Sequence, residues 1–333
     1  MCAVWEERMI RSFVMSEGKV VGQDLDVDAL RIVRADKGLH IWVDLFQPSE
    51  SEVREILELL FGFHPLAIED CVAPNHLPKV EDYEDYLFLV IHAVDFSRKD
   101  KFTTTELDLF LGKEFLVTHH TAPMRSIASA MERLQKNAGQ AARGVDRLMH
   151  SILDSVVEHY NPVLAEITAE INELEEQIFS ESKKPDVRLL QEFRKVKAET
   201  NELRQILRPQ QEVIARLAAG EFKLIRPVVL PYFRDIRDML ARIDMVAGNL
   251  QDQLYLAMDV YLNRVQAHTN EIIKVLAVLT AVTTPVMVIG TWYGMNFEGM
   301  LELKPAISYW IIIALTIIST VVLMWWMKKK DYI

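Results

Sequence analysis

Two long runs without charge near the C-terminus constrain this chain more than any other feature. Residues 275–297 and residues 305–327 each hold 23 amino acids without Asp, Glu, Lys or Arg. A helix needs about 20 apolar residues to cross a hydrocarbon layer of roughly 30 Å. We therefore predict two transmembrane helices. A buried hairpin of a soluble domain is the weaker alternative, because the second run is uniformly apolar and its aromatic residues cluster at both ends.

The charges beside these runs predict their orientation. Lys328, Lys329 and Lys330 follow the second run, whereas the connecting loop carries Glu298, Glu302 and one lysine. Lysines are enriched on the cytoplasmic side of transmembrane helices. We therefore expect a multi-pass protein of the plasma (inner) membrane, with both termini in the cytoplasm and the loop outside.

Composition narrows the class of the remaining chain. The net charge of −11 disfavours a nucleic-acid partner. Two cysteines, Cys2 and Cys71, fit a reducing compartment better than a disulfide framework. The first residues contain no apolar stretch long enough for a signal peptide, so we expect the large N-terminal part in the cytoplasm.

The sequence pattern predicts the domains. Residues 1–143 mix short β-branched and aromatic runs with a helical stretch, which indicates an α/β domain. The elements expected there are strands at 39–46, 87–96, 104–112 and 114–120, a helix at 50–63 and a hairpin turn at Gly112-Lys113. Residues 144–226 predict a long helical hairpin that breaks at Lys184-Pro185. The remaining segments are a stalk helix over 227–297 that continues into the first span, an extracellular loop at 298–304, the second span at 305–327 and a basic tail at 328–333.

A polar stripe follows the long helix at alternating steps of four and three residues. It consists of Asp259, Asn263, Gln266, Asn270, Ile273, Ala277, Thr280, Thr284, Met287 and Thr291. Seven of these ten are polar or charged, and a period of about 3.5 residues keeps them on one face of a supercoiled helix. Polar side chains in a membrane face other helices or water. Helix contact alone is an alternative, but the stripe continues outside the membrane, which favours a water-filled axis lined by these residues.

A pore along this stripe requires several chains, because two transmembrane helices cannot enclose one. The stripe of each first span would face a common axis in a homo-oligomer. Gly290 and Gly294 lie four residues apart and would let neighbouring backbones approach closely. The second span is bulky and branched throughout, which suits an outer ring against lipid.

These features carry a resemblance to a known family. Tyr293-Gly294-Met295-Asn296 at the end of the first span, with a second span and a Lys-rich tail, resembles the CorA family of magnesium channels. Residues 61–88 are similar to the cytoplasmic signature of that family, and residues 228–240 and 261–276 are similar to its stalk. The resemblance covers nearly the whole chain.

The resemblance implies a fold and an activity. The implied fold is an α+β cytoplasmic domain with α/β/α layers, a long helical stalk and two transmembrane helices, assembled as a homopentameric funnel. The implied activity is passive influx of Mg²⁺, with Co²⁺ and Ni²⁺ as further ions. Gly294, Met295 and Asn296 would form the selectivity filter, where a ring of Asn296 amide oxygens holds the hydrated ion through its waters. Glu298 and Glu302 would attract cations to this mouth.

The resemblance also implies regulation by intracellular Mg²⁺. Acidic residues of the family bind Mg²⁺ between cytoplasmic domains and hold the pore closed. The matching positions are Asp70 and Asp235, with Glu69 and Asp154 as a second pair. Loss of the ion would leave facing carboxylates that repel, and linkage would then favour the open assembly.

Other matched positions concern the pore itself. Ile273 and Leu276 match the hydrophobic gate of the family, and Lys328–Lys330 match its basic ring near the cytoplasmic mouth, although lysines there also anchor topology. Two departures stand out. Leu301 replaces the proline that is usual in the outer loop of the family. Thr284 stands where some members carry methionine, and this threonine weakens an apolar barrier at that level. We therefore expect the main constriction at Ile273 and Leu276.

Three other functions stay open at this point. A Zn²⁺ transporter of the same superfamily more often carries valine at the position of Met295, and the polar stripe lacks the His and Cys ligands that Zn²⁺ prefers. A membrane-anchored enzyme is disfavoured because common catalytic motifs are absent from the sequence, and His119-His120 on a strand would point to opposite faces in a structural role. A coiled-coil sensor without transport would need an apolar stripe.

Overall fold

The computed structural model describes residues 10–73, 77–94, 104–136, 143–179, 187–295 and 308–330. The chain divides into two compact units. The first unit comprises Met1–Glu176 and Arg188–Tyr255, and the second comprises Gln177–Val187 and Leu256–Ile333.

The first unit is built on a mixed β-sheet. Its strands are β1 (Ile10–Ser16), β2 (Lys19–Gln23), β3 (His40–Phe46), β4 (Lys79–Asp82), β5 (Tyr86–Val94), β6 (Thr104–Gly112) and β7 (Phe115–His120). Their order in the sheet is β2-β1-β3-β7-β6-β5-β4, in which only β3 and β7 pair in parallel among the described residues. The hairpin predicted at Gly112-Lys113 is confirmed, since β6 and β7 are antiparallel neighbours.

Three of these strands were not predicted from the sequence. β2 and β4 lie at the two edges of the sheet and have only five and four residues, and β1 joins β2 to the central strands. Edge strands hold their conformation by pairing with a neighbour rather than by an apolar pattern of their own. Local composition therefore gives little signal for them.

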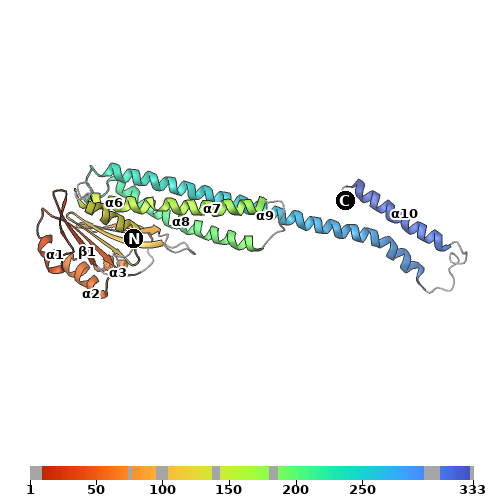
Figure 1. Ribbon diagram of the computed structural model, residues 1–333, viewed down its shortest axis with the longest axis horizontal. Helices are drawn as coiled ribbons and strands as arrows, with labels where there is room; N and C mark the ends of the chain where they lie inside the picture. The colour runs from red at the N-terminus through yellow and green to blue at the C-terminus, as the bar shows by residue number, and fades with distance from the viewer. Residues whose placement is uncertain are drawn as a thin grey trace. The chain divides into compact units, whose positions relative to one another are not determined.

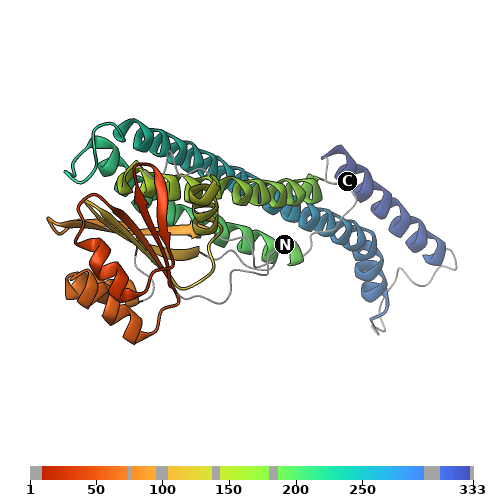
Figure 2. The same cartoon turned by 60° about the vertical axis from the view of Figure 1, so that its left-hand side comes forward.

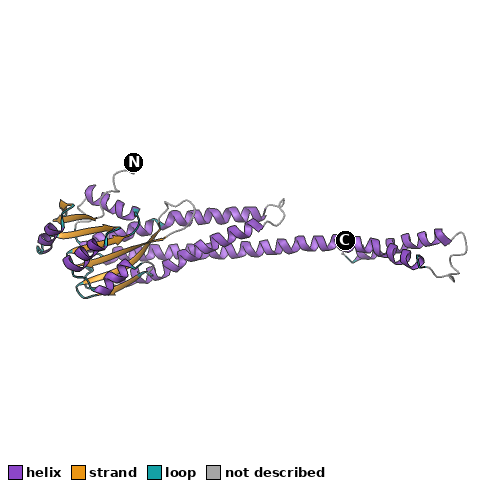
Figure 3. Cartoon of the chain, turned by 90° about the horizontal axis from the view of Figure 1, so that it is seen from below, coloured by secondary structure: helices purple, strands orange, loops and turns teal. Residues whose placement is uncertain are grey.

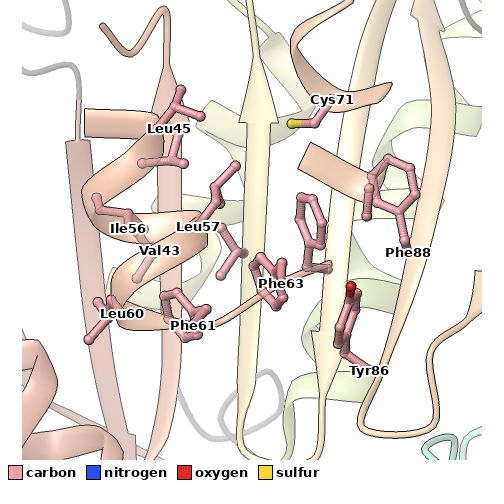
Figure 4. Close-up of a cluster of buried hydrophobic side chains, with 14 of the residues drawn as sticks. Val43, Leu45, Ile56, Leu57, Leu60, Phe61, Phe63, Cys71, Tyr86 and Phe88 are labelled. Carbon is pink, nitrogen blue, oxygen red and sulfur yellow. The ribbon is translucent and has the colours of Figure 1, made fainter. Parts of the chain in front are cut away.

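One face of the sheet is covered by short helices. These are α1 (Val27–Arg34), α2 (Glu50–Val53), the π-helical η1 (Arg54–Leu60) that continues it, and α3 (Pro65–Val72). Their apolar side chains, such as Ile56 and Leu57, belong to one buried cluster with Val43 of the sheet (Figure 4). Phe63 stacks on Phe110 with ring centroids 4.2 Å apart. Burial of these aromatic and aliphatic side chains is the main stabilising term for this layer.

Longer helices cover the opposite face. They are α4 (Arg125–Lys136), α6 (Val145–Glu158), α7 (Tyr160–Phe179) and α8 (Val187–Ala219), and α6 contacts β3, β5, β6 and β7. The hydroxyl of Tyr160 donates to the carbonyl of His92 at 2.7 Å, and the amide of His92 donates to Gln210 Oε1 at 3.0 Å. The expected α/β/α layering is thus confirmed, with the sheet between two helical layers (Figures 1 and 2).

Two helices complete the fold. α9 runs without interruption over Leu230–Tyr293, and its 64 residues correspond to about 96 Å at 1.5 Å per residue. Its first part belongs to the first unit and the rest to the second. α10 spans Ser308–Lys329 (Figure 3). The predicted long helix that enters an apolar span is confirmed as a single element.

Candidate ion path and regulatory sites

The second unit holds the two helices that can cross a membrane. The apolar parts of α9 and α10 both have a mean hydropathy of 2.2, and they are long enough to span a bilayer. α10 lies beside the last part of α9 (Figures 1 and 2). The apolar window of α9 has no buried residue within the chain, so most of its surface is available to lipid, water or another copy.

Each of the two helices has one half-buried face in its apolar part. On α9 the half-buried residues of this part recur at helical spacing and include Val278, Ala281, Pro285 and Ile289. On α10 the half-buried residues include Thr316, Ser319, Thr320 and Leu323. Small side chains on α10 allow close helix packing in a membrane.

The polar stripe lies on the other side of α9. All ten stripe residues are exposed in the chain. With about 100° of rotation per residue, the part of the stripe from Ala277 to Thr291 is centred roughly 125° from the half-buried face of α9. The face that α10 leaves uncovered is therefore the face that carries the polar residues.

The threonines of this stripe have their hydroxyl hydrogens committed to the helix. Thr280 donates to the carbonyl of Leu276 at 2.8 Å, Thr284 donates to Thr280 at 2.7 Å, and Thr291 donates to Met287 at 2.6 Å. A hydroxyl has one hydrogen to donate and two lone pairs that accept. These three side chains consequently present acceptor oxygens, without a donor, to whatever faces the stripe.

Near the C-terminal end of α9 lie two glycines, Gly290 and Gly294, that differ in their surroundings. The amide of Gly294 donates to the carbonyl of Gly290 at 2.9 Å, and a Cβ on Gly294 would meet that same oxygen at 2.9 Å. A Cβ on Gly290 would meet nothing within 4 Å. Met295 follows and is exposed. The predicted filter residue Asn296, the loop carboxylates Glu298 and Glu302, and Leu301 lie outside the described residues.

The predicted gate and basic ring lie on exposed surface. Ile273 and Leu276 are 57% and 60% exposed, which is unusual for large apolar side chains unless lipid or another chain covers them. Lys328, Lys329 and Lys330 are exposed at the end of α10, and Lys329 Nζ lies 5.3 Å from the centre of the Trp325 ring.

The four predicted regulatory residues fall on opposite sides of the sheet. Glu69 and Asp70 lie on α3, where Glu69 is exposed and Asp70 pairs with Lys79, which also contacts Glu81 at 2.9 Å. Asp154 lies on α6 and Asp235 on α9, in the other layer. One chain therefore does not bring Asp70 together with Asp235.

Asp154 and Asp235 form an acidic group within the chain. Burial raises the pKa of Asp154, and repulsion by Glu158 and Asp235 raises it further, against the opposing effect of Arg133. Burial lowers the pKa of the neighbouring His150, and Arg147 adds to this. These neighbouring carboxylates repel one another. Their oxygen atoms are the ligands that a hard divalent cation prefers, and such a cation would neutralise the repulsion.

Comparison with known proteins decides the family. Residues 38–329 match the family described as CorA-like Mg²⁺ transporter protein. The chain belongs to the CorA family of metal ion transporters. The cobalt/magnesium transport protein CorA of Thermotoga maritima is 29% identical over 310 residues, which cover 92% of this chain and 87% of that protein.

More distant relatives include a zinc transporter. The zinc transport protein ZntB of Yersinia pseudotuberculosis is 20% identical, over 95% of this chain and 94% of that protein. The solved structure of the CorA magnesium transporter from Methanocaldococcus jannaschii has a TM-score of 0.79 at 18% identity, over 97% of this chain and 98% of that one. That likeness confirms the predicted fold of an α/β domain, a long helix and two C-terminal apolar helices.

Sequence reasoning missed one polar cluster of this CorA family member. His119 Nδ1 lies 3.0 Å from Asp108 Oδ2, whereas His120 Nε2 lies 3.4 Å from Asp44, so the two histidines serve opposite faces as predicted. Cys71 of α3 interacts with the same Asp108 carboxylate, and burial raises the pKa of Asp108 to about 6. No motif marks these residues, because only strand pairing and helix packing bring positions 71, 108 and 119 together.

Proposed function

We propose that this chain forms a channel for passive Mg²⁺ influx, with Co²⁺ and Ni²⁺ as further permeant ions. The observation that carries the proposal is the polar stripe, which is exposed along the face of α9 that α10 leaves free. Names of relatives support the ion class, since the Thermotoga maritima protein is a cobalt/magnesium transport protein.

The chemistry of the stripe suits a hydrated ion. Mg²⁺ dehydrates reluctantly and keeps several waters. Those waters point their hydrogens outward and need acceptors. Thr280, Thr284 and Thr291 offer oxygen acceptors whose own hydrogens are already donated to the helix backbone. Neutral oxygens also hold the ion weakly enough to let it move on.

Assembly follows from the number of helices. Two spans per chain cannot enclose a path, so each chain contributes the stripe of α9 to a common axis and α10 forms the outer ring. We propose a homopentamer in the plasma (inner) membrane with both termini in the cytoplasm, as the CorA resemblance implies. The basic ring of Lys328–Lys330 then lies near the cytoplasmic mouth, where it also anchors the topology.

The outer mouth is assigned to Gly294, Met295 and Asn296. Five Asn296 amide oxygens would hold the hydrated ion, while Glu298 and Glu302 raise the local cation concentration. Gly290, which has open space around it in the chain, would allow the neighbouring helix to come close.

The constriction is assigned to Ile273 and Leu276. Rings of these exposed apolar side chains would exclude water from a narrow path and so stop conduction. Thr284 is polar and weakens a second apolar barrier closer to the mouth. The gate therefore lies near the inner end of the span.

Intracellular Mg²⁺ is proposed to close the channel. Asp70 and Glu69 of one chain would meet Asp235 and Asp154 of its neighbour, because the two pairs lie on opposite faces of one sheet. An ion bridging two protomers favours the closed assembly by its higher affinity for that arrangement.

A flux assay tests the mouth. Purified protein is reconstituted into liposomes that contain a Mg²⁺ dye, and wild type is compared with Asn296→Ala and with the exposed control Asn161→Ala. We expect rapid entry for wild type and the control, and loss of most of the flux for Asn296→Ala. Equal flux in Asn296→Ala would remove the assignment of the mouth.

Limited proteolysis tests the regulatory residues. Millimolar Mg²⁺ is expected to protect wild type, and Asp235→Ala or Asp70→Ala should lose this protection. Asp238→Ala is the matched control, since Asp238 is exposed one turn further along α9 and pairs with Arg237 at 2.8 Å. Full Mg²⁺ protection of both Asp235→Ala and Asp70→Ala would contradict the regulatory role.

Zinc transport is the second candidate function. The similarity to the zinc transport protein ZntB over most of both chains favours it. Against it, the polar stripe contains no His or Cys and offers mainly amide, hydroxyl and carboxylate oxygens, whereas Zn²⁺ prefers imidazole nitrogen and thiolate sulfur. Parallel flux measurements with a Zn²⁺ dye distinguish the two.

A further inference from the structure

Three metal-ligating side chains meet in the core of the first unit. Cys71 comes from α3, Asp108 from β6 and His119 from β7, and their ligand atoms all lie within 4.8 Å of one another. Their exposed fractions are 4%, 2% and 4%. Figure 4 shows the Cys71 sulfur pointing away from α3 toward the strands.

The fold itself sets this arrangement. Asp108 and His119 are directly opposite residues in the antiparallel pair β6–β7, so their side chains emerge side by side on one face. α3 packs on that face through Ala67 and Cys71. Backbone pairing and core packing thus hold three ligands that come from three separate elements.

The hydrogen bonding of the cluster is incomplete. Asp108 Oδ2 contacts His119 Nδ1 at 3.0 Å, and the Cys71 thiol also interacts with this carboxylate, but Asp108 Oδ1 is buried and has no hydrogen bond of normal geometry among the residues that the structure describes. A buried carboxylate oxygen without a partner is costly, and native proteins rarely leave one without a reason. A bound cation would satisfy this oxygen.

The cluster also has access from outside. His119 lines a cavity of about 280 Å³, together with Ile68, Val72 and the polar residues Gln47 and Thr121. The cavity is large enough for water molecules, which need about 30 Å³ each. Of the three ligands only His119 lines this cavity, so an ion or a fourth, exchangeable ligand would reach the cluster past that side chain.

We propose that Cys71, Asp108 and His119 form a binding site for a thiophilic divalent cation of the Zn²⁺ or Co²⁺ type. One sulfur, one nitrogen and one oxygen ligand with an open fourth position match the tetrahedral preference of these ions. Ligand atoms around Zn²⁺ lie roughly 3.5 Å apart, so the three side chains would close by about 1 Å on binding. Mg²⁺ is a poor fit, because it demands an octahedral shell of oxygen atoms.

The position of this site links it to the proposed regulation by Mg²⁺. It lies in the α/β layers of the first unit, and Cys71 directly follows Asp70 on α3. A cation at Cys71 would fix the helix that carries Glu69 and Asp70, so the level of a thiophilic ion would bias Mg²⁺ regulation. This last consequence rests on the proposed function, whereas the binding site does not.

Cobalt absorption tests the site directly. The full-length protein with Cys2→Ser retains Cys71 as its single thiol. Co²⁺ added in the presence of excess Mg²⁺ should give a thiolate-to-cobalt charge-transfer band that saturates at one Co²⁺ per chain. Addition of Zn²⁺ should displace the cobalt and abolish the band.

Variants assign the ligands. Cys71→Ser should abolish the band, and His119→Gln should weaken Co²⁺ binding by about tenfold or more. His120→Gln is the matched control, because His120 is equally buried but contacts Asp44 on the other face. Circular dichroism checks that each variant is folded.

The outcomes separate this proposal from the transport proposal. Absence of the band in the folded Cys2→Ser protein would overturn the site whatever the ion flux. Persistence of the band in Cys71→Ser would overturn it as well. Both readouts are independent of Mg²⁺ transport, so loss of transport with a retained cobalt band would count against the channel alone.

Discussion

The ion pair between Asp146 and Arg226 gives the sharpest stability prediction. It joins the start of α6 to the segment that leads into α9. The Asp146 side chain is only 3% exposed and accepts three hydrogen bonds from Arg226, from the backbone amide at 3.1 Å, from Nε at 2.9 Å and from Nη2 at 2.5 Å. Asp146 also raises the pKa of Arg226 through these bonds.

The cost of Arg226→Ala follows from this geometry. Removing one partner of a buried pair typically costs about 3–5 kcal/mol, because the other charge stays buried without compensation. The Arg226 side chain is 47% exposed and one bond to Asp146 comes from the backbone, so we expect a smaller loss of about 2–3 kcal/mol. For a unit of this size that corresponds to a fall in Tm of about 4–12 °C.

Thermal unfolding of the detergent-solubilised protein, followed by circular dichroism, measures this loss. Arg54→Ala is the control, since Arg54 pairs with Glu58 at 3.4 Å but both side chains are more than half exposed. That pair should contribute less than about 1 kcal/mol. A fall in Tm for Arg226→Ala no larger than that for Arg54→Ala would refute the reasoning. A double-mutant cycle with Asp146→Ala should show strong coupling between the two residues.

Three further predictions follow from the structure. Gly294→Ala forces its Cβ against the Gly290 carbonyl oxygen and should cost about 1–3 kcal/mol of local strain, whereas a Cβ at Gly290 fits the single chain. Loss of the oligomer by Gly290→Ala in cross-linking would therefore report contact with a neighbouring chain. An unchanged oligomer would argue against close packing there. Burial lowers the pKa of His150, so the contribution of His150 to stability is complete above its ordinary pKa of about 6.5 and is lost as the pH falls through the lower pKa of the folded state. The Tm of wild type should therefore drop more steeply below about pH 6.5 than the Tm of His150→Gln. Equal slopes would exclude this cause. In a background with Cys2→Ser and Cys71→Ser, a charged thiol reagent should label Thr284→Cys but not Val282→Cys, and equal labelling would contradict a water-filled stripe.

The membrane part of this fold is largely predictable from the sequence. A long uncharged run and a repeated period of about 3.5 residues are local signals in the sequence of α9. The helix and its exposed stripe can therefore be predicted without knowing which distant residues contact them. The hairpin between β6 and β7 also has a local signal in Gly112-Lys113.

The parts that the sequence did not predict depend on contacts between distant residues. β2 and β4 exist because neighbouring strands pair with them. Asp108 and His119 are 11 residues apart and Cys71 lies in another element, so no spacing rule marks the cluster. Which of the proposed regulatory carboxylates would face one another is also non-local, because Asp70 and Asp235 lie in different layers of one chain.

Ion entry into liposomes measures the proposed Mg²⁺ transport itself. Wild-type protein is reconstituted, and initial rates are recorded in parallel with a Mg²⁺ dye and a Zn²⁺ dye inside the vesicles, with protein-free vesicles as the background. We expect fast Mg²⁺ entry driven by its gradient alone, and a much slower entry of Zn²⁺. Zn²⁺ entry without Mg²⁺ entry, or no entry of either ion above background, would contradict it.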